Sequence, residues 1–267
     1  MVSRGKRGRL HLPAYFVLTF AWTWLMWGSA AAAGLSADEP PGALLYLSGV
    51  FGPLVGAAWV LRGGESTYRR AFLQRIWDPR RVPAMWWVAL VAVAGGPAAL
   101  GAIVAAMTGA TPSLPDYGLG SIGAAIVVAL IAGVAEEPGW RGAASDAWQA
   151  RTRPVWAATG IGALWSLWHL PLHVLEGSWY HGMGIGSVRF WLVHLLLVML
   201  GVLYTWLANG SGNSILIAIL AHAGFNVAAG LVPSSTTRDV VAFITVTVAT
   251  VFIIVATKGR LAFETPE

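Results

Sequence analysis

The 267-residue sequence is 57% hydrophobic and only 11% charged, with a mean hydropathy of +0.65. Soluble globular domains carry about 25% charged residues, so a water-facing surface of this size is excluded. Cysteine is absent, which excludes disulfides, thiolate metal sites and a cysteine nucleophile. The net charge of +5 comes from arginines in loops between apolar segments. Membrane proteins carry arginine there, so we expect membrane lipid as a partner and no nucleic acid.

Apolar runs long enough to cross a bilayer recur along the whole chain. The first follows a basic segment and is longer than the core of a secretory signal peptide, so a retained span is favoured over cleavage near residues 31–33. The fifth is expected to be a helix that ends near Glu176. The other predicted spans are 12–35, 43–61, 84–107, 119–137 and beyond, 188–208, 214–231 and 240–257. The sequence therefore predicts one all-α integral membrane domain, residues 1–267, with about eight spans.

Positive charge is distributed very unevenly between the two sides of this predicted bundle. Only Arg189 and Arg238 fall on the side away from the termini. The other fifteen of the 17 lysines and arginines fall on the side of the termini: Arg4, Lys6, Arg7, Arg9, Arg62, Arg69, Arg70, Arg75, Arg80, Arg81, Arg141, Arg151, Arg153, Lys258 and Arg260. Positive loops remain in the cytoplasm, so we predict a multi-pass plasma-membrane protein with both termini cytoplasmic. We expect the arginine-rich segment 62–81 to be a plain topogenic loop rather than an interfacial helix on anionic lipid.

Few polar groups interrupt the predicted spans, and they recur at helical spacing. They are Glu136, Glu137, His169, His173, His194, His222 and Asn226. A charged group in hydrocarbon costs several kcal/mol, so these side chains should face the bundle interior. His222 and Asn226 are four residues apart, as are His169 and His173, so each pair should share one helix face. Prolines within two of these stripes free backbone carbonyls that need protein or water as a partner, which predicts a hydrated cavity.

Three short blocks contain most of these groups: Glu-Glu-Pro-Gly-Trp-Arg-Gly from residue 136, Trp-Ser-Leu-Trp-His from residue 165, and His-Ala-Gly-Phe-Asn from residue 222. Their order and spacing resemble the CPBP family of intramembrane endopeptidases, the CAAX prenyl protease and bacteriocin-processing group. The resemblance implies a catalytic core at about residues 119–232. It also implies hydrolysis of a peptide bond in a membrane cavity open to the cytoplasm.

The resemblance also implies a role for each matching residue. Glu136 with His169 would activate the attacking water, and Glu137 would support or share that task. Arg141 would anchor the glutamates or the kinked helix. His222 would orient the scissile carbonyl and stabilise its oxyanion.

Asn226 would share the role of His222, as a preorganised donor to the oxyanion. Two positions depart from the family pattern, since Trp165 replaces the commoner Phe and His173 adds an imidazole. We expect His173 to pack or line the cavity, and His194, which matches no block, to be structural.

A metal ion remains open from the sequence. Glu136, His169 and His222 could form a His₂Glu zinc site, but a local His-Glu-x-x-His helix is missing, and metal-independent chemistry is favoured. The substrate is expected to be a peptide or protein, which carries a lipid for some family members. Two other functions stay open: a membrane transporter, and a non-catalytic binding or immunity protein that uses the same polar cavity.

Overall fold

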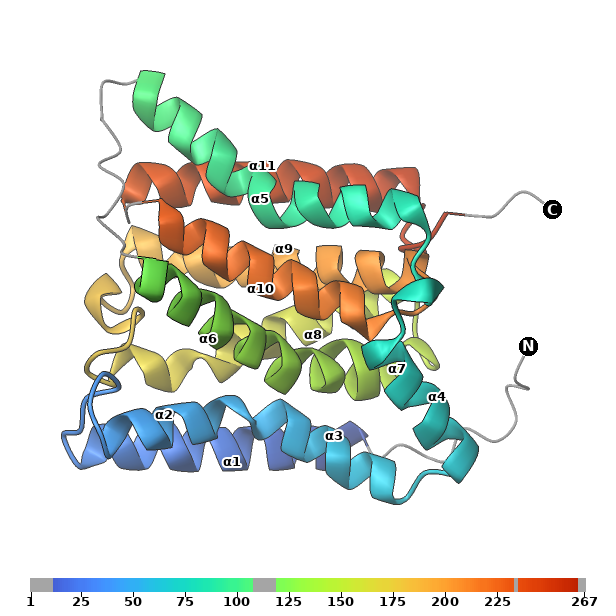
Figure 1. The fold of residues 1–267 in the computed structure, drawn as a ribbon, viewed down its shortest axis with the longest axis horizontal. Coiled ribbons are helices and arrows are strands. Elements are labelled where there is room, and N and C mark those ends of the chain that lie inside the picture. Colours follow the sequence, from blue (N-terminus) through green and yellow to red (C-terminus); the bar gives the residue numbers. More distant parts are fainter. Residues whose placement is uncertain (1–11, 108–118, 233–234, 264–267) are drawn as a thin grey trace.

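The computed structural model describes residues 12–107, 119–232 and 235–263, and all regular elements in these ranges are helical (Figure 1). The all-α prediction is confirmed. The α-helices are α1 (Leu12–Ala32), α2 (Gly42–Val50), α3 (Gly52–Arg62), α4 (Ser66–Trp77), α5 (Ala84–Met107), α6 (Leu119–Glu137), α7 (Ser145–Gln149), α8 (Pro154–Trp168), α9 (Val188–Gly210), α10 (Ile215–Leu231) and α11 (Thr236–Ala256). Short 3₁₀ turns occur at Pro79–Arg81, Leu170–His173 and His181–Met183, and a π-helix at Pro138–Ala144.

Several of these helices are long and apolar enough to cross a membrane. Four described helical segments meet both criteria: Ala84–Met107, Gly120–Gln149, Val188–Gly210 and Thr236–Ala256. The pair α2 and α3, bent by 43°, forms a fifth candidate if it is one span. The helices therefore fit a multi-pass integral membrane protein. The count of eight spans remains a prediction, because it also requires α1, α8 and α10 to cross.

Helix α9 lies at the centre of the bundle, between α8 and α11, and small residues allow its neighbours to approach closely (Figure 1). A Cβ atom at Gly162 of α8 would lie 2.7 Å from the carbonyl oxygen of Val198 on α9. A Cβ atom at Gly133 of α6 would lie 2.7 Å from the carbonyl oxygen of Ile219 on α10. Glycine permits such backbone contacts between membrane helices. These two crossings bring α6, α8 and α10 together around α9.

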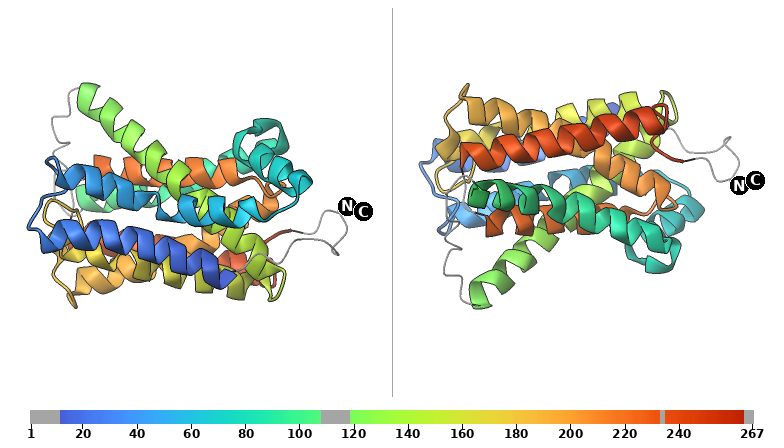
Figure 2. Two further views of the ribbon diagram at one scale, coloured as in Figure 1. Left: turned by 90° about the horizontal axis from the view of Figure 1, so that it is seen from below. Right: turned by 90° about the horizontal axis from the view of Figure 1, so that it is seen from above.

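The bundle has two distinct ends. At one end, which we call the basic end, α1 begins and α11 ends. This end also carries α4 and the turn from α7 to α8, and it lies at the right of Figure 1. The far end is formed by the turn between α1 and α2, the segment 169–187 and the start of α11. Figure 2 shows that the first half of α6 leans away from the other helices near the far end. Most of its side chains from residue 120 to 128 are exposed.

The arginine-rich segment 62–81 contains a helix, so the prediction of a plain loop is wrong. Helix α4 buries Phe72 and Ile76 against Ile215 and Ile219 of α10. Packing of this apolar face stabilises the helix, which the charges alone did not predict.

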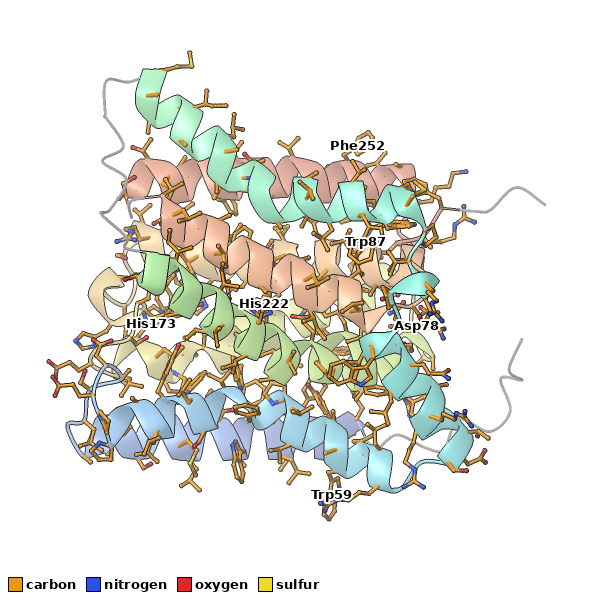
Figure 3. All side chains as sticks on the ribbon, in the orientation of Figure 1. Trp59, Asp78, Trp87, His173, His222 and Phe252 are labelled. Carbon is orange, nitrogen blue, oxygen red and sulfur yellow. The ribbon has the colours of Figure 1, made fainter. Side chains whose placement is uncertain are left out.

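The second correction concerns α8, which ends at Trp168 and not near Glu176. Leu170 precedes Pro171, and a residue before proline is disfavoured in the α-conformation. The chain therefore continues as a 3₁₀ turn at Leu170–His173. His169 caps α8, whereas His173 lies beyond the helix, so the prediction that they share a helix face is wrong. In Figure 3, His222 lies in the middle of the bundle and His173 nearer the far end.

Candidate active site

The two adjacent glutamates lie at the last turn of α6, where the helix widens. Pro138 has no backbone N–H, so the regular hydrogen-bond pattern cannot continue through it. Residues Pro138–Ala144 form a π-helix that is buried throughout, and α7 continues it to Gln149. Such π-helical segments occur often at functional sites. Both glutamates belong to α6, and adjacent residues on a helix point in different directions, so Glu136 and Glu137 meet different surroundings.

Glu136 faces a cavity and is hydrogen-bonded to the next helix along the chain. Its Oε2 accepts a hydrogen bond of 2.7 Å from the indole Nε1–H of Trp165 on α8. The side chain is 4% exposed and lines the cavity. Phenylalanine, the commoner residue at position 165 in the resembling family, has no N–H to donate. The tryptophan therefore fixes the carboxylate in a way that phenylalanine cannot.

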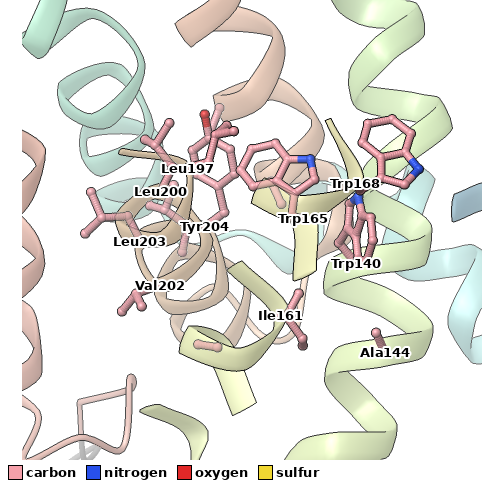
Figure 4. Packing of buried hydrophobic residues seen from close by; sticks show 14 of the residues in the cluster. Trp140, Ala144, Ile161, Trp165, Trp168, Leu197, Leu200, Val202, Leu203 and Tyr204 are labelled. Atoms are coloured by element: carbon pink, nitrogen blue, oxygen red, sulfur yellow. The ribbon is translucent and has the colours of Figure 1, made fainter. Parts of the chain in front are cut away.

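Glu137 is fully buried and does not line the cavity. Its Oε1 accepts from the Arg141 guanidinium at 3.2 Å and lies 2.8 Å from Nδ1 of His222. The guanidinium carbon of Arg141 also lies over the rings of Trp165, at 4.7 Å, and Tyr204, at 5.1 Å. Glu137 therefore links Arg141 to His222. The rings of Trp165 and Tyr204 lie next to each other in the core, with centroids 6.0 Å apart (Figure 4).

His169 and His222 both present the same ring nitrogen to the cavity. Nδ1 of His169 lies 2.8 Å from the carbonyl oxygen of Trp165, which can only accept, so this nitrogen carries the proton. Nδ1 of His222 likewise donates to the carboxylate of Glu137. Because the partner of Nδ1 determines the tautomer, Nε2 of each ring is left for substrate, water or metal. The ring of Trp165 packs edge-on against both imidazoles.

One cavity of about 560 Å³ is lined by most of the predicted site residues. The catalytic candidates on its wall are Glu136, His169, His222 and Asn226, and we call them the cavity group. Asn226 is exposed, which contradicts the expectation of a residue buried in the bundle interior. The reason is that the first half of α6 leans away and leaves this face of α10 uncovered (Figure 2). A smaller cleft of about 280 Å³ between α6 and α10 adjoins the cavity through Asn226.

Tyr180 is a cavity residue that sequence reasoning missed. It lies outside the helices, and its ring centroid is 5.1 Å from that of His169. Burial raises the pKa of the Tyr180 phenol, so the group stays protonated and can donate a hydrogen bond. No helical spacing links Tyr180 to the other site residues. The aromatic pair Trp179-Tyr180, ten residues after the end of the histidine block, was the available signal.

A second cluster of histidines lies outside this cavity. Nε2 of His173 is 3.0 Å from Nε2 of His194, so one ring donates to the other. Nδ1 of His194 is 2.7 Å from Oγ of Ser166. Burial lowers the pKa of His173 from its ordinary value of 6.5. We call His173 and His194, together with Ser166, the histidine pair. His173 was expected to pack or to line the cavity, and it does not line the cavity.

The residues that could hold zinc do not form a ligand set as they are placed. Free Nε2 atoms with Nδ1 fixed by a carbonyl or carboxylate resemble metal-binding histidines. Among the residues that the structure describes, however, no group of three or more His, Asp or Glu side chains is arranged to hold a metal ion.

The cavity extends from the catalytic candidates towards the far end, where Ala229, Gly230, Val232 and Arg238 line it. The sequence predicted a cavity open to the cytoplasm and, from charge, cytoplasmic termini. Helix α1 begins and helix α11 ends at the basic end, whereas the cavity extends towards the far end (Figure 1). The predicted cytoplasmic termini and the predicted cytoplasmic opening of the cavity therefore point to opposite ends of the bundle.

Fold and site together define a helical membrane protein with a carboxylate and two imidazoles around one buried cavity. Residues 118–228 match the family described as type II CAAX prenyl endopeptidase Rce1-like, and this range includes the whole cavity group. The chain is also 24% identical over 216 residues to CAAX prenyl protease 2 of Methanococcus maripaludis, covering 78% of this chain and 80% of that protein. The predicted resemblance to CAAX-protease-like CPBP proteins is confirmed, because residues 118–228 match the Rce1-like family. This match supports an intramembrane endopeptidase.

Proposed function

We propose that the protein hydrolyses a peptide bond inside the membrane with a water molecule activated by Glu136 and His169. The observation that carries the proposal is the shared cavity, in which a fixed carboxylate and two free imidazole nitrogens lie together with Asn226. Carboxylates and imidazoles positioned in this way serve as general acids and bases, and each such group contributes about 10²–10⁴-fold to the rate.

In the proposed reaction, Glu136 and His169 accept a proton from water while its oxygen attacks the carbonyl carbon of the scissile bond. The carbonyl oxygen becomes an oxyanion, to which the Asn226 amide donates a hydrogen bond. His222 donates a second one from Nε2 when its ring is protonated on both nitrogens, as an imidazolium paired with Glu137. The proton then passes to the amide nitrogen as the C–N bond breaks, which releases an amine and a carboxylic acid. Glu137 and Arg141 hold the ring of His222 in place and do not contact substrate.

This mechanism needs no metal, and we propose metal-independent catalysis. Glu136 already shares its carboxylate with the indole of Trp165, and His222 is oriented by Glu137. The substrate is a polypeptide. If it carries a lipid, the apolar cleft between α6 and α10, which adjoins the cavity, is the space that would accept the chain.

We also propose the orientation that the charges predict, with eight spans and both termini in the cytoplasm. The lysines and arginines of the described loops gather at the basic end, and positive loops are retained in the cytoplasm. The three shorter or less apolar helices α1, α8 and α10 complete the count. Each is integrated in the bundle: the indole of Trp168 on α8, for example, donates to Thr23 on α1 at 2.8 Å.

The test is capture of a substrate followed by cleavage. Glu136→Gln keeps the size of the side chain but removes the base, so it should retain bound polypeptide that the parent protein releases as products. A polypeptide enriched with Glu136→Gln is then offered to purified parent protein in detergent or vesicles. Cleavage by the parent and by His194→Ala, but not by Glu136→Gln or His169→Ala, supports the proposal. Normal cleavage by folded Glu136→Gln protein would refute it.

A further inference from the structure

The outer face of α4 lines an open groove of about 680 Å³ at the basic end (Figure 1). The helix lies between the end of α3 and the start of α5, where one candidate membrane span ends and another begins. Its buried face packs on α10, so the groove is formed by side chains that point the other way. The wall includes Arg69, Arg70, Leu73, Trp77, Asp78 and Arg80.

Three guanidinium groups of this groove have no partner among the residues that the structure describes. Arg69 and Arg70 lie on α4 and Arg80 in the 3₁₀ turn that follows, and all three are exposed. Neither an ion pair nor a side-chain hydrogen bond joins any of them to another described residue. Asp78, the acid on this wall, caps the 3₁₀ turn by accepting from the backbone N–H of Arg80 at 3.1 Å. The groove therefore carries an excess of positive charge.

Apolar side chains lie beside these cations. Leu73 is 51% exposed and Trp77 is 67% exposed, and they follow Arg69 at intervals of four residues, so the three share one helix face. An exposed tryptophan next to a span end is typical of the boundary between lipid and water. A phosphate ion in water gains nothing from such a surface, whereas the glycerol and acyl parts of a phospholipid do.

The buried face of α4 connects the groove to the core of the bundle. Phe72 approaches Gly142 of the π-helix so closely that a Cβ atom there would lie 2.6 Å from its ring. Arg75, which points inward, forms an ion pair of 2.6 Å with Asp146 on α7. The π-helix and α7 directly follow α6, which ends with the two glutamates. A ligand that holds the outer face of α4 therefore also stabilises the segment behind the glutamates.

We infer that this groove binds the phosphate headgroup of an anionic phospholipid. The unpaired guanidinium groups donate hydrogen bonds to the phosphate oxygens, and Leu73 and Trp77 contact the glycerol and the upper part of the acyl chains. A zwitterionic headgroup fits less well, because its ammonium group would lie among three guanidinium groups. The charges of segment 62–81 favoured a plain topogenic loop, whereas the exposed face of α4 makes it an interfacial helix on anionic lipid.

The experiment compares two double variants of equal charge. Arg70→Gln with Arg80→Gln removes two cations of the groove. Arg62→Gln with Arg81→Gln is the matched control, because both residues are exposed at the same end and neither lines the groove. Native mass spectrometry measures binding of phosphatidylglycerol and of phosphatidylcholine to purified protein in detergent. Thermal unfolding is followed in the same mixtures, with inorganic phosphate and glycerol phosphate as soluble probes.

We expect the parent and the control to bind phosphatidylglycerol, and to unfold at a higher temperature with it than with phosphatidylcholine. The groove variant should bind phosphatidylglycerol roughly 30-fold more weakly, since each arginine at an anionic surface contributes about fivefold. Without added lipid it should unfold like the parent. Equal lipid binding by the two double variants would overturn the inference. Equal stabilisation of the parent by a soluble phosphate would also overturn it, because the groove would then belong to a soluble ligand.

A second pair of variants tests the apolar part of the groove. Trp77→Ala should weaken phosphatidylglycerol binding several-fold, because the indole contacts the lipid. Trp156→Ala is the matched control, since Trp156 begins α8 at the same end, is 64% exposed and does not line the groove. It should bind phosphatidylglycerol like the parent. Equal binding by Trp77→Ala and Trp156→Ala would contradict the proposed contact with lipid.

Discussion

The cavity group and the histidine pair are two buried polar clusters in the same bundle, yet only the first has the surroundings of a catalytic site. Both contain imidazoles that are hydrogen-bonded to neighbouring side chains or backbone. In the cavity group, each histidine Nδ1 has a fixed acceptor, and both rings line the same cavity as the carboxylate of Glu136. In the histidine pair, the two Nε2 atoms face each other.

This difference shows that burial and helical spacing alone do not identify catalytic histidines in a membrane protein. His194 is as buried as His169, at 7% exposure each. What separates them is the hydrogen bonding of the ring. Both nitrogens of His194 have side-chain partners, Ser166 and His173, whereas Nδ1 of His169 bonds the Trp165 carbonyl and the ring lines the cavity. Interhelical hydrogen bonds between polar side chains are a common structural device in membranes.

The largest effect should come from removing the base of the cavity group. Glu136→Gln and His169→Ala should each lower the cleavage rate by about 10³–10⁴-fold, because general base catalysis depends on both. The double variant should be little slower than either single variant, since the two residues act on one water molecule. Cleavage rates of the captured substrate test this. Effects that multiply in the double variant would show that the residues act independently.

Asn226→Ala sharpens the comparison at the exposed edge of the cavity group. Loss of one oxyanion donor costs about 10²–10³-fold in rate, so this variant should be slow but measurable. The Michaelis constant should change little, because the oxyanion exists only in the transition state. A variant that binds substrate weakly but cleaves it at the normal maximal rate would assign Asn226 to binding instead.

Trp165→Phe tests whether the carboxylate of Glu136 needs its indole partner. A hydrogen bond to a charged group contributes about 1.5–3 kcal/mol, which corresponds to roughly 10- to 100-fold in rate. The loss should appear in the maximal rate. Trp206→Phe is the matched control, since Trp206 packs edge-on against Trp86 away from the cavity, with ring centroids 4.9 Å apart. Equal effects of the two substitutions would mean that Trp165 acts only through packing.

His194→Ala probes the other side of the comparison, the histidine pair. It should leave the cleavage rate within about threefold of the parent but lower stability by about 1–3 kcal/mol, because Ser166 and His173 lose a buried partner. Thermal unfolding of the purified protein in detergent measures the second effect. His181→Ala, at an exposed position, should change neither quantity. A severe loss of cleavage in folded His194→Ala protein would show that the cavity group and the histidine pair act as one site.

Metal removal should have the smallest effect. Prolonged treatment of purified protein with a strong chelator should leave cleavage unchanged, and metal analysis should find no stoichiometric zinc. If chelation abolished activity and zinc restored it, Glu136, His169 and His222 would be metal ligands. Chelation of His194→Ala protein serves as a control for effects on folding.

Some of these features follow from the sequence because they depend on local physical costs. A chain with so few charges cannot cover itself with a water-facing surface, so composition alone predicts helices in a membrane. Glu136, His169 and His222 stand out because an ionisable group in hydrocarbon requires a compensating environment. Their three sequence blocks also carry the family resemblance that residues 118–228 bear out.

Other features depend on which faces meet, and here only the tertiary structure decides. Glu136 and Glu137 point in different directions as neighbours on a helix, but only the packing decides that the first lines the cavity and the second contacts His222. Apolar packing makes a helix of α4, whereas its arginines alone predicted a loop. The direction of the cavity is likewise set by contacts between segments far apart in the chain. Spacing along a helix fixes which residues share a face, but not what that face meets.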